Sequence, residues 1–292
     1  MAALTWKVGL VTITRIPEIV VDLPLEELLP EAGPAAVAPH RGWLEPHFLG
    51  PDGRFPLSIH GLVVDTGDLR ILVDTCLGPH PIPGFENLAL GAADFLAGLA
   101  AAGYPREAID IVLCTHLHFD HVGWNTVREG DRTVPAFPNA RYLFARTEWE
   151  HWSTAPPGAY TPTFDAAVRP VVAAGQADFV EQDHKLCDSV RLVPTAGHTP
   201  GHVSVEIASQ GERAIITGDA THHPVQWAEP DWKIPADVDS AAAAATRRRV
   251  ADALADTPVL VIGTHYAPPC AGHLVRGANG VWFRAKPEEM QL

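Results

Sequence analysis

The stretch THLHFDHVG, Thr115 to Gly123, places three histidines and an aspartate in one short segment. It directly follows the apolar run IDIVLC, Ile109 to Cys114, which is typical of a strand buried on both faces. A packed core has little use for such side chains, because buried polar groups need partners and buried charges need compensation. The segment is therefore either a histidine-rich solvated loop or half of a metal site.

The spacing within the segment favours the metal site. His116 and His118 are two residues apart, so an extended backbone points both side chains the same way. Asp120 and His121 follow on a backbone that must turn. Four ligands from one loop crowd a single tetrahedral ion, but they can serve two neighbouring ions. Imidazole and carboxylate ligands without a thiolate suit zinc, and also iron, manganese or cobalt.

Later strand ends supply further candidate ligands. The stretch TAGHTPGH places His198 in a glycine-flanked turn, while ITGDA and IGTHY place Asp219 and His265 at the ends of apolar runs. His202 repeats after His198, and we interpret it as a residue that orients a ligand. The candidate metal ligands are therefore His116, His118, Asp120, His121, His198, Asp219 and His265.

The chain repeats one order of elements. Residues 55–75 predict a hairpin turning at Thr66–Asp68, residues 88–104 a helix that stops at Gly103, and residues 109–114 a strand. Residues 202–219 then predict a second hairpin, residues 239–256 a helix capped by Asp239 or Ser240, and residues 258–265 a strand. Two β-rich halves covered by helices indicate a four-layer α+β sandwich, with the site where strand ends meet.

We expect one domain over residues 1–292. Residues 124–190 are rich in tryptophan, phenylalanine and proline, and we expect them to form a cap or insert between the two halves. Phe119 and several tryptophans near the motifs could wall an apolar pocket.

The composition excludes several classes of partner. The chain has 292 residues and a formal charge of −14, so it should repel nucleic acid and anionic membranes. Arg247–Arg249 follow an alanine run and predict a solvated or salt-bridged helix face. The four cysteines form no CxxC pair, so we expect no disulfide framework and a reducing compartment. Without a signal peptide or an apolar run of about 18 residues, we expect a cytoplasmic protein.

The pattern H-x-H-x-D-H at His116 to His121, followed by His198, Asp219 and His265, resembles the metallo-β-lactamase superfamily over roughly residues 55–270. Because Asp120 is present and no cysteine is among the ligands, the set resembles its dinuclear hydrolases, in particular acyl-homoserine lactone lactonases and methyl parathion hydrolases. The resemblance implies an αββα sandwich and suggests a homodimer. It also implies that His116, His118 and His198 hold one ion and Asp120, His121 and His265 the other.

In that resemblance Asp219 bridges the two ions together with a hydroxide, and Asp120 passes a proton to the leaving group. Acyl-homoserine lactonases have a substrate-contacting tyrosine three residues beyond the bridging aspartate, where this chain has His222. A histidine can still donate a hydrogen bond to substrate, so we predict that His222 binds substrate; the alternative is that His222 and His223 line a solvated rim.

We therefore expect a hydrolase with two divalent transition-metal ions, zinc before manganese, cobalt or iron. Its substrate should be a small, fairly apolar, ester-like molecule, a lactone first. A phosphotriesterase is the main alternative, and a thioesterase similar to glyoxalase II comes third. The acidic charge disfavours an RNA nuclease, the complete ligand set disfavours a non-catalytic relative, and His118 disfavours the electron-transfer di-iron relatives.

Overall fold

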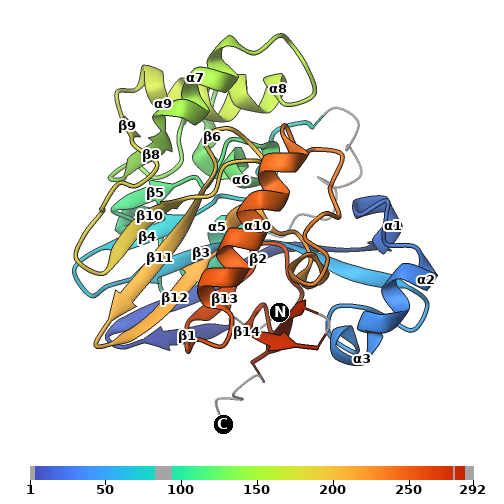
Figure 1. Cartoon of the computed structure of the whole chain (residues 1–292). Helices are drawn as coiled ribbons and strands as arrows, with labels where there is room; N and C mark the ends of the chain where they lie inside the picture. The colour runs from blue at the N-terminus through green and yellow to red at the C-terminus, as the bar shows by residue number, and fades with distance from the viewer. Residues whose placement is uncertain (1–3, 83–93, 279, 287–292) are drawn as a thin grey trace.

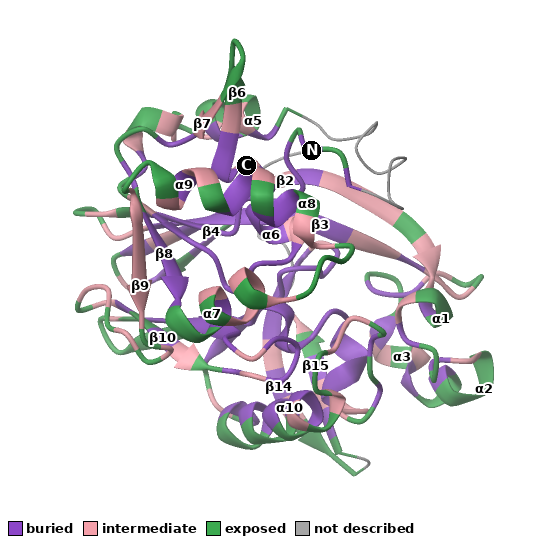
Figure 2. Cartoon of the chain, turned by 90° about the horizontal axis from the view of Figure 1, so that it is seen from above, coloured by how far each residue is buried: buried purple, intermediate pink, exposed green. Residues whose placement is uncertain are grey.

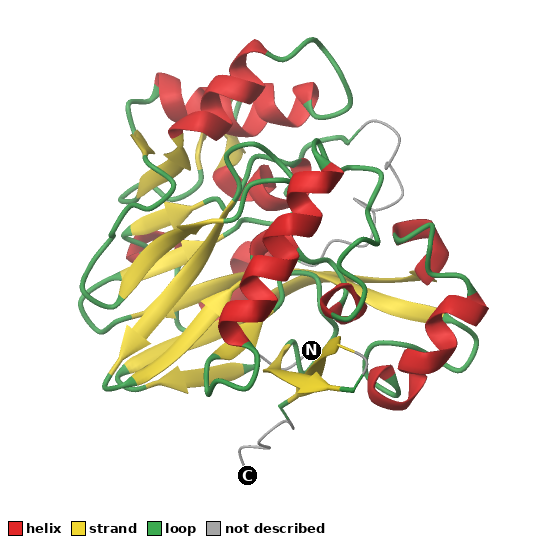
Figure 3. Ribbon diagram, viewed as in Figure 1, coloured by secondary structure: helices red, strands yellow, loops and turns green. Residues whose placement is uncertain are grey.

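Two β-sheets lie face to face at the centre of the molecule, and helices cover their outer faces (Figures 1 and 3). The computed structural model describes residues 4–82, 94–278 and 280–286. The first sheet runs in the order β1 (Thr5–Val8), β2 (Val11–Pro24), β3 (Arg54–Asp65), β4 (Arg70–Val73), β5 (Ile111–Leu113), β8 (Arg141–Ala145) and β9 (Ala177–Val180). The second runs β10 (Val190–Pro194), β11 (Val203–Ser209), β12 (Glu212–Ile216), β13 (Leu260–Ile262), β14 (Ala271–Gly277) and β15 (Gly280–Ala285). The predicted four-layer α+β sandwich is confirmed.

The helices are short except on one outer face. They are α1 (Leu25–Leu28), α2 (Pro34–Val37), α3 (Arg41–Leu44), α5 (Phe95–Ala101), α6 (Phe119–Val122), α7 (Arg146–Thr154), α8 (Thr161–Thr163), α9 (Arg169–Ala173) and α10 (Ser240–Leu254). Single helical turns are η1 (Ala38–His40), η2 (Arg106–Ala108), η3 (Gly123–Asn125), η4 (Phe164–Val168), η5 (Gly218–Ala220) and η6 (Pro224–Trp227). A separate hairpin consists of β6 (Thr126–Glu129) and β7 (Arg132–Pro135).

Both predicted hairpins are present. Strands β3 and β4 pair antiparallel with Leu62 opposite Val73, and β11 and β12 pair antiparallel with Val205 opposite Ile216. Parallel pairing then joins β4 to β5, β5 to β8 and β12 to β13. The parallel strands β5 and β13 bring the carboxyl ends of two predicted ligand-bearing strands to the same part of the sandwich.

Successive residues along a buried strand belong to different hydrophobic cores, one on each face of the sheet. Ile71 and Val73 of β4 belong to the core between the two sheets, whereas Leu72 packs with Leu99 of α5. In β13, Ile262 belongs to the core between the sheets and Val261 to the core beneath α10. Figure 2 shows this buried material running through the strands. Strands covered on both faces need apolar residues at every position, which explains the continuous apolar runs of the sequence.

The two predicted helices are capped by aspartates. Asp239 caps α10 by accepting a hydrogen bond from the Ala242 backbone N–H at 2.9 Å. Asp94 caps α5 in the same way, and Gly103 ends that segment at a φ of +93°. The part of the predicted helix before Asp94 lies outside the described residues.

Of the two expected settings, solvated or salt-bridged, Arg247 takes the second, because its Nη1 lies 3.9 Å from Asp237 Oδ2. The Arg247 side chain is fully buried, and its Nε donates to the Pro230 carbonyl at 2.8 Å. The reason is the helical period: Arg247 shares the inner face of α10 with Ala243, Val250 and Leu254. Arg248 forms an ion pair with Asp231 on the exposed side, as expected.

The interval 124–190 contains elements of two kinds. Strands β8 and β9 extend the first sheet, while α7, α8 and α9 lie together beyond its end (Figure 1). Its aromatic residues Trp149 and Phe164 pack against the core of the first sheet. All four cysteines are free in the structure. None of the helices in the described ranges is long and apolar enough to cross a membrane.

Candidate metal centre

The predicted ligands come from segments that follow strands. His116 and His118 follow β5, and α6 begins directly after His118, so Asp120 and His121 lie in its first turn. Asp219 lies in η5 after β12, and His265 follows β13. His198 lies in the loop between β10 and β11. The turning backbone expected after His118 is therefore a helical turn. It points the side chains of Asp120 and His121 in a different direction from those of His116 and His118.

The seven side chains converge into overlapping groups. Each group has its ligand atoms within 4.8 Å of one another. Among the described residues, the groups formed by these seven side chains alone are His116, His118 and His198; His116, His121 and Asp219; and Asp120, His121 and His265. Except for Asp120, whose side chain is 18% exposed, these residues are buried. The first and third groups have the composition that the family resemblance implies for two separate ions.

Asp219 lies between these two groups. Its Oδ2 is 3.5 Å from His198 Nε2 and 3.2 Å from His121 Nε2. Its Oδ1 is 3.1 Å from His265 Nε2. One carboxylate therefore reaches nitrogen ligands of both groups, which is the arrangement that a bridging ligand requires.

Three of the histidines are oriented by a hydrogen bond at Nδ1. The pairs are His121 Nδ1 with Asp74 Oδ2 at 2.8 Å, His198 Nδ1 with Asp237 Oδ1 at 3.0 Å, and His265 Nδ1 with the Ser58 carbonyl at 3.0 Å. Because a carboxylate or carbonyl oxygen can only accept, each Nδ1 carries the proton and donates it. In the neutral ring, Nε2 then presents a lone pair toward the centre, as metal-binding histidines do.

The unsatisfied atoms at the centre fit a cation. His121 Nε2 and His265 Nε2 lie 3.2 Å apart, so in the neutral rings two lone pairs face each other. His116 Nε2 and Asp219 Oδ1 are buried and have no hydrogen-bond partner. Either protons or metal ions must lie among these atoms, because such groups are costly to bury unpaired. Five imidazoles and two carboxylates form a donor set that suits divalent transition metals.

The electrostatics of the centre agree with this fit. Burial holds the pKa of His116 and of His118 well below the usual range, so both rings are neutral, which is the form that binds a metal. Burial also works to lower the pKa of His121, but the surrounding carboxylates, led by Asp219, raise it well above the usual range. Burial works to raise the pKa of Asp219, but His121 and His265 hold it well below normal. The carboxylates thus attract positive charge to this point.

His202 orients the segment that contains Asp219. Its Nε2 accepts a hydrogen bond from the Asp219 backbone N–H at 2.8 Å, while Nδ1 lies 3.1 Å from the Thr195 carbonyl. Burial lowers the pKa of His202 to about 3, so the ring remains neutral and can accept. Gly218 makes this contact feasible, because its φ is +53° and a Cβ there would lie 2.6 Å from His202 Nε2. His202 therefore fixes the backbone at Asp219, as an orienting residue would.

His222 lies at the centre rather than on a solvated rim. It is 6% exposed, and its Nε2 is 2.9 Å from Asp219 Oδ2. Its ring stacks on His265, with ring centres 5.4 Å apart, and burial lowers its pKa. Its ligand atom also lies within 4.8 Å of those of His198 and Asp219, so geometry alone permits metal contact as well as substrate contact. His223 is structural, because its Nε2 donates to the Phe48 carbonyl at 2.7 Å.

Comparison with known proteins agrees with this geometry. The sequence profile of the metallo-β-lactamase superfamily matches residues 54–265. The chain belongs to this superfamily. It is 26% identical to an N-acyl homoserine lactonase of Bacillus thuringiensis over 193 residues, which cover 60% of this chain and 68% of the lactonase. It is 28% identical to a probable metallo-hydrolase of Mycobacterium bovis over 195 residues, covering 57% and 58%. The expected hydrolase class is thus confirmed.

Solved structures share the fold over nearly the whole chain. The hydrolase AbOPH superposes with a TM-score of 0.79 at 24% identity, covering 98% of this chain and 97% of AbOPH. AidC, a dizinc quorum-quenching lactonase, superposes with a TM-score of 0.78 at 21% identity, covering 98% of each chain. The similarity extends beyond residues 54–265 to the N-terminal strands.

A cavity of about 380 Å³ opens onto the ligands of this superfamily member. Its lining includes the polar side chains of His118, Asp120, His198, Asp219, His222 and His265. Its walls are mainly apolar and come from β2, α1, β3 and the segment before α10: Val21, Leu23, Leu28, Leu57, Ile59, Ile234 and Ala236, together with Phe119 and Tyr160. Glu27 is the remaining charged residue among its described lining. The cavity therefore combines side chains that could bind a metal with a mainly apolar lining.

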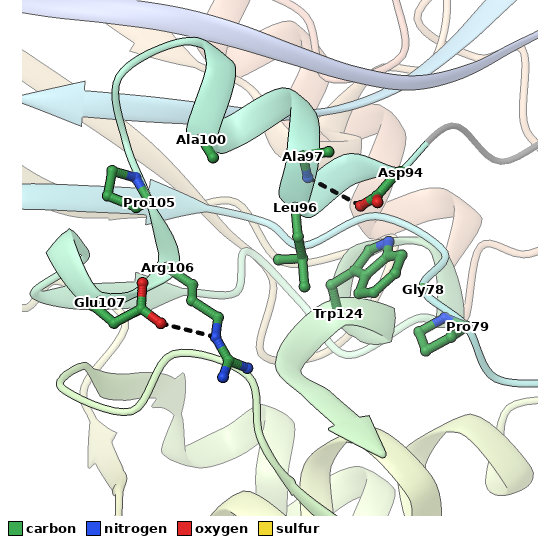
Figure 4. Close-up of a pocket in the computed structure, with 10 residues that line it drawn as sticks. All are labelled: Gly78, Pro79, Asp94, Leu96, Ala97, Ala100, Pro105, Arg106, Glu107 and Trp124. Carbon is green, nitrogen blue, oxygen red and sulfur yellow. Dashed lines mark hydrogen bonds and ion pairs between the residues drawn. The ribbon is translucent and has the colours of Figure 1, made fainter. Parts of the chain in front are cut away.

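A larger cavity of about 780 Å³ lies elsewhere and has no predicted ligand in its lining (Figure 4). Its charged groups are already paired: Asp94 caps α5, and Arg106 Nε lies 3.1 Å from Glu107 Oε1. Trp124, expected near an apolar pocket, lines this cavity instead of the metal centre.

Three carboxylates that support the centre, Asp74, Asp237 and Glu148, are not among the residues predicted from the sequence. Asp74 follows β4 just as His116 follows β5, so the same strand-end signal could have found it. Asp237 lies in an irregular segment, and Glu148 lies within the polar helix α7. No pattern in the sequence distinguishes these two from solvent-exposed acids.

Proposed function

We propose that this chain is a dinuclear metal-dependent hydrolase of small, neutral, ester-like substrates with an apolar substituent, lactones first. The observation that supports this most is that one cavity is lined both by the predicted metal-ligand side chains and by apolar side chains. The relatives named N-acyl homoserine lactonases add weight to the lactone assignment. The substrate is then a small molecule. Its reacting group would face the predicted metal ligands, and its hydrocarbon part would lie against β2 and β3.

The residues divide between two ions. His116, His118 and His198 would hold one, Asp120, His121 and His265 the other, and Asp219 both. Zinc suits this set, and manganese, cobalt or iron could replace it. Two divalent ions, when bound, acidify water and polarise the scissile carbonyl.

Asp120 would move the proton. It belongs to the second group and also lines the cavity, with its Oδ2 3.5 Å from His265 Nε2. In lactone hydrolysis the water oxygen bonds to the carbonyl carbon, the ring C–O bond breaks, and the leaving alkoxide needs a proton. Asp120 can accept the proton that water loses and donate it to this alkoxide, which gives the open hydroxy acid.

The described walls of the cavity offer no cation to an anionic substrate. Glu27 is the lining carboxylate outside the proposed ligand set, so an anionic thiol conjugate meets repulsion there, and this places a thioesterase below a lactonase. Our proposal keeps His222 as a substrate contact, because it lines the cavity beside Asp219 and its Nδ1 has no hydrogen-bond partner. A phosphotriester is also neutral and apolar, and the histidine at position 222 favours it as the second candidate.

A hydrolysis panel tests the proposal. Aliphatic lactones, aryl esters, phosphotriesters and thioesters would be compared by kcat/KM with the zinc-, manganese- and cobalt-loaded protein, and with Asp120→Asn as the matched control. The proposal expects lactones to dominate. Dominance of phosphotriesters or thioesters would replace the substrate assignment, and no hydrolysis of any class would reject the function.

A further inference from the structure

Glu148 is a buried carboxylate outside the ligand set. It lies in α7, which follows β8 directly and packs against β8 and β9 (Figure 1). Its Oε1 accepts hydrogen bonds from the Leu117 backbone N–H at 3.1 Å and from Trp152 Nε1 at 2.6 Å. Its Oε2 accepts one from the Gly201 backbone N–H at 2.9 Å. The residue is only 1% exposed, and these three partners are neutral N–H groups.

Two of these partners belong to loops that contain metal ligands. Leu117 lies between His116 and His118, and Gly201 lies three residues after His198. The second loop approaches α7 closely, since a Cβ on Gly201 would lie 2.2 Å from the Glu148 backbone nitrogen. A single carboxylate therefore joins the two separate loops that supply the first ligand group. None of its three hydrogen bonds involves Asp120, His121 or His265.

The same region contacts His118 from the side. Tyr160 stacks on the His118 ring, with ring centres 4.1 Å apart and planes at 10°, and Trp152 meets it edge to face at 5.3 Å. Trp152 is thus held by Glu148 through its Nε1 while its ring contacts a ligand. Burying a carboxylate without a cation is costly, and three charge-assisted hydrogen bonds offset that cost only while both loops remain in place.

We propose that Glu148 is a positioning residue that holds the loops of His116, His118 and His198 at ligand distance and so sets the affinity of the first ion. The inference rests on the two-ion site of the proposed function. Helix α7, which contains none of the predicted ligands, would then affect the affinity for one ion and not for the other.

The test is Glu148→Gln in the full-length, metal-loaded protein. Glutamine has one acceptor oxygen, so its NH₂ group must face an N–H donor of either Gly201 or the Leu117–Trp152 pair. The exposed Glu150→Gln on the same helix is the matched control. Cobalt binding would be titrated against a competing chelator, with the visible spectrum and thermal unfolding recorded in parallel.

We expect Glu148→Gln to weaken one of the two cobalt sites by about 10- to 100-fold, as loss of a supporting contact does elsewhere, and to leave the other site and Glu150→Gln unchanged. Asp74→Asn, which acts on His121, should weaken the other site, so the double variant should lose both. Unchanged constants in Glu148→Gln would overturn the inference. An equal loss at both sites with a lower melting temperature would also overturn it, since that is a general structural effect.

Trp152→Phe covers the case in which Glu148→Gln does not fold. It removes one donor to Glu148, so the same site should weaken by about two- to tenfold; no change there rejects the inference. The wild-type protein separates the two proposals. If it binds two ions but hydrolyses nothing in the panel, the proposed function fails while the role of Glu148 stands.

Discussion

Replacing Asp74 with asparagine should weaken one of the two proposed ion sites and leave the other intact. Asp74 receives three hydrogen bonds: Thr115 N–H donates to Oδ1 at 2.7 Å, while Thr115 Oγ1 and His121 Nδ1 donate to Oδ2 at 2.9 and 2.8 Å. The contact with His121 both orients the ring and, through the carboxylate charge, strengthens Nε2 as a ligand. No other member of the ligand set bonds to Asp74 among the described residues.

The magnitude follows from counting acceptors. With its oxygen in the place of Oδ2, asparagine keeps two of the three hydrogen bonds, but its NH₂ group then faces the Thr115 N–H. That buried clash should cost about 1–3 kcal/mol of folding free energy. His121 keeps an acceptor without the charge, so affinity for the ion held with Asp120 and His265 should fall by about 10- to 100-fold.

The assay is a two-step zinc or cobalt titration against a chelator, with Asp110→Asn as the control. Asp110 is exposed and accepts one backbone hydrogen bond from Arg70, so the same chemical change there should leave both constants unaltered. Two unchanged constants in Asp74→Asn, or an equal fall in both, would refute the assignment of His121 to a separate ion.

Three further predictions concern Asp120 and His222, which line the cavity, and the neighbouring His223. Asp120→Asn should lower kcat by at least about 100-fold through loss of the proton carrier, with metal content measured alongside. His222→Ala should keep both ions and lower kcat/KM by an amount equivalent to about 1–3 kcal/mol of transition-state contacts. Loss of an ion in this variant would make His222 a metal ligand. His222→Tyr should raise kcat/KM for acyl-homoserine lactones and lower it for phosphotriesters. Burial lowers the pKa of His223 from 6.5 to about 4, so its contribution to stability is complete above pH 6.5 and is lost as pH falls toward 4. Unfolding free energy should therefore drop by about 1.4 kcal/mol per pH unit in that window from this residue alone. His223→Asn should show a correspondingly flatter profile in chemical denaturation, and equal slopes would contradict the prediction.

The sequence was sufficient to predict the fold and the side chains that converge at the centre, because both depend on local patterns. A titratable residue directly after a buried strand is visible in one dimension, as with His116 and His265. The glycine-turn hairpins and the aspartate cap of α10 are equally local. The parallel arrangement then brings these strand ends together by rules that apply to sandwiches generally.

The supporting residues could not be predicted because their roles depend on long-range packing. Glu148 precedes Gly201 by 53 residues, and Asp237 follows His198 by 39. The pairing of the buried Arg247 with Asp237 likewise depends on how α10 packs against the irregular segment before it. His222 shows the limit at the site itself: its position was expected, but its contact with Asp219 leaves metal and substrate roles to experiment.

The number of ions per chain tests the central claim most directly. Elemental analysis of the protein, saturated with zinc and freed of excess, should give close to two ions per chain, because the first and third ligand groups have no member in common and Asp219 reaches both. A ratio that remains at one would contradict the dinuclear site and reduce Asp219 to a terminal ligand.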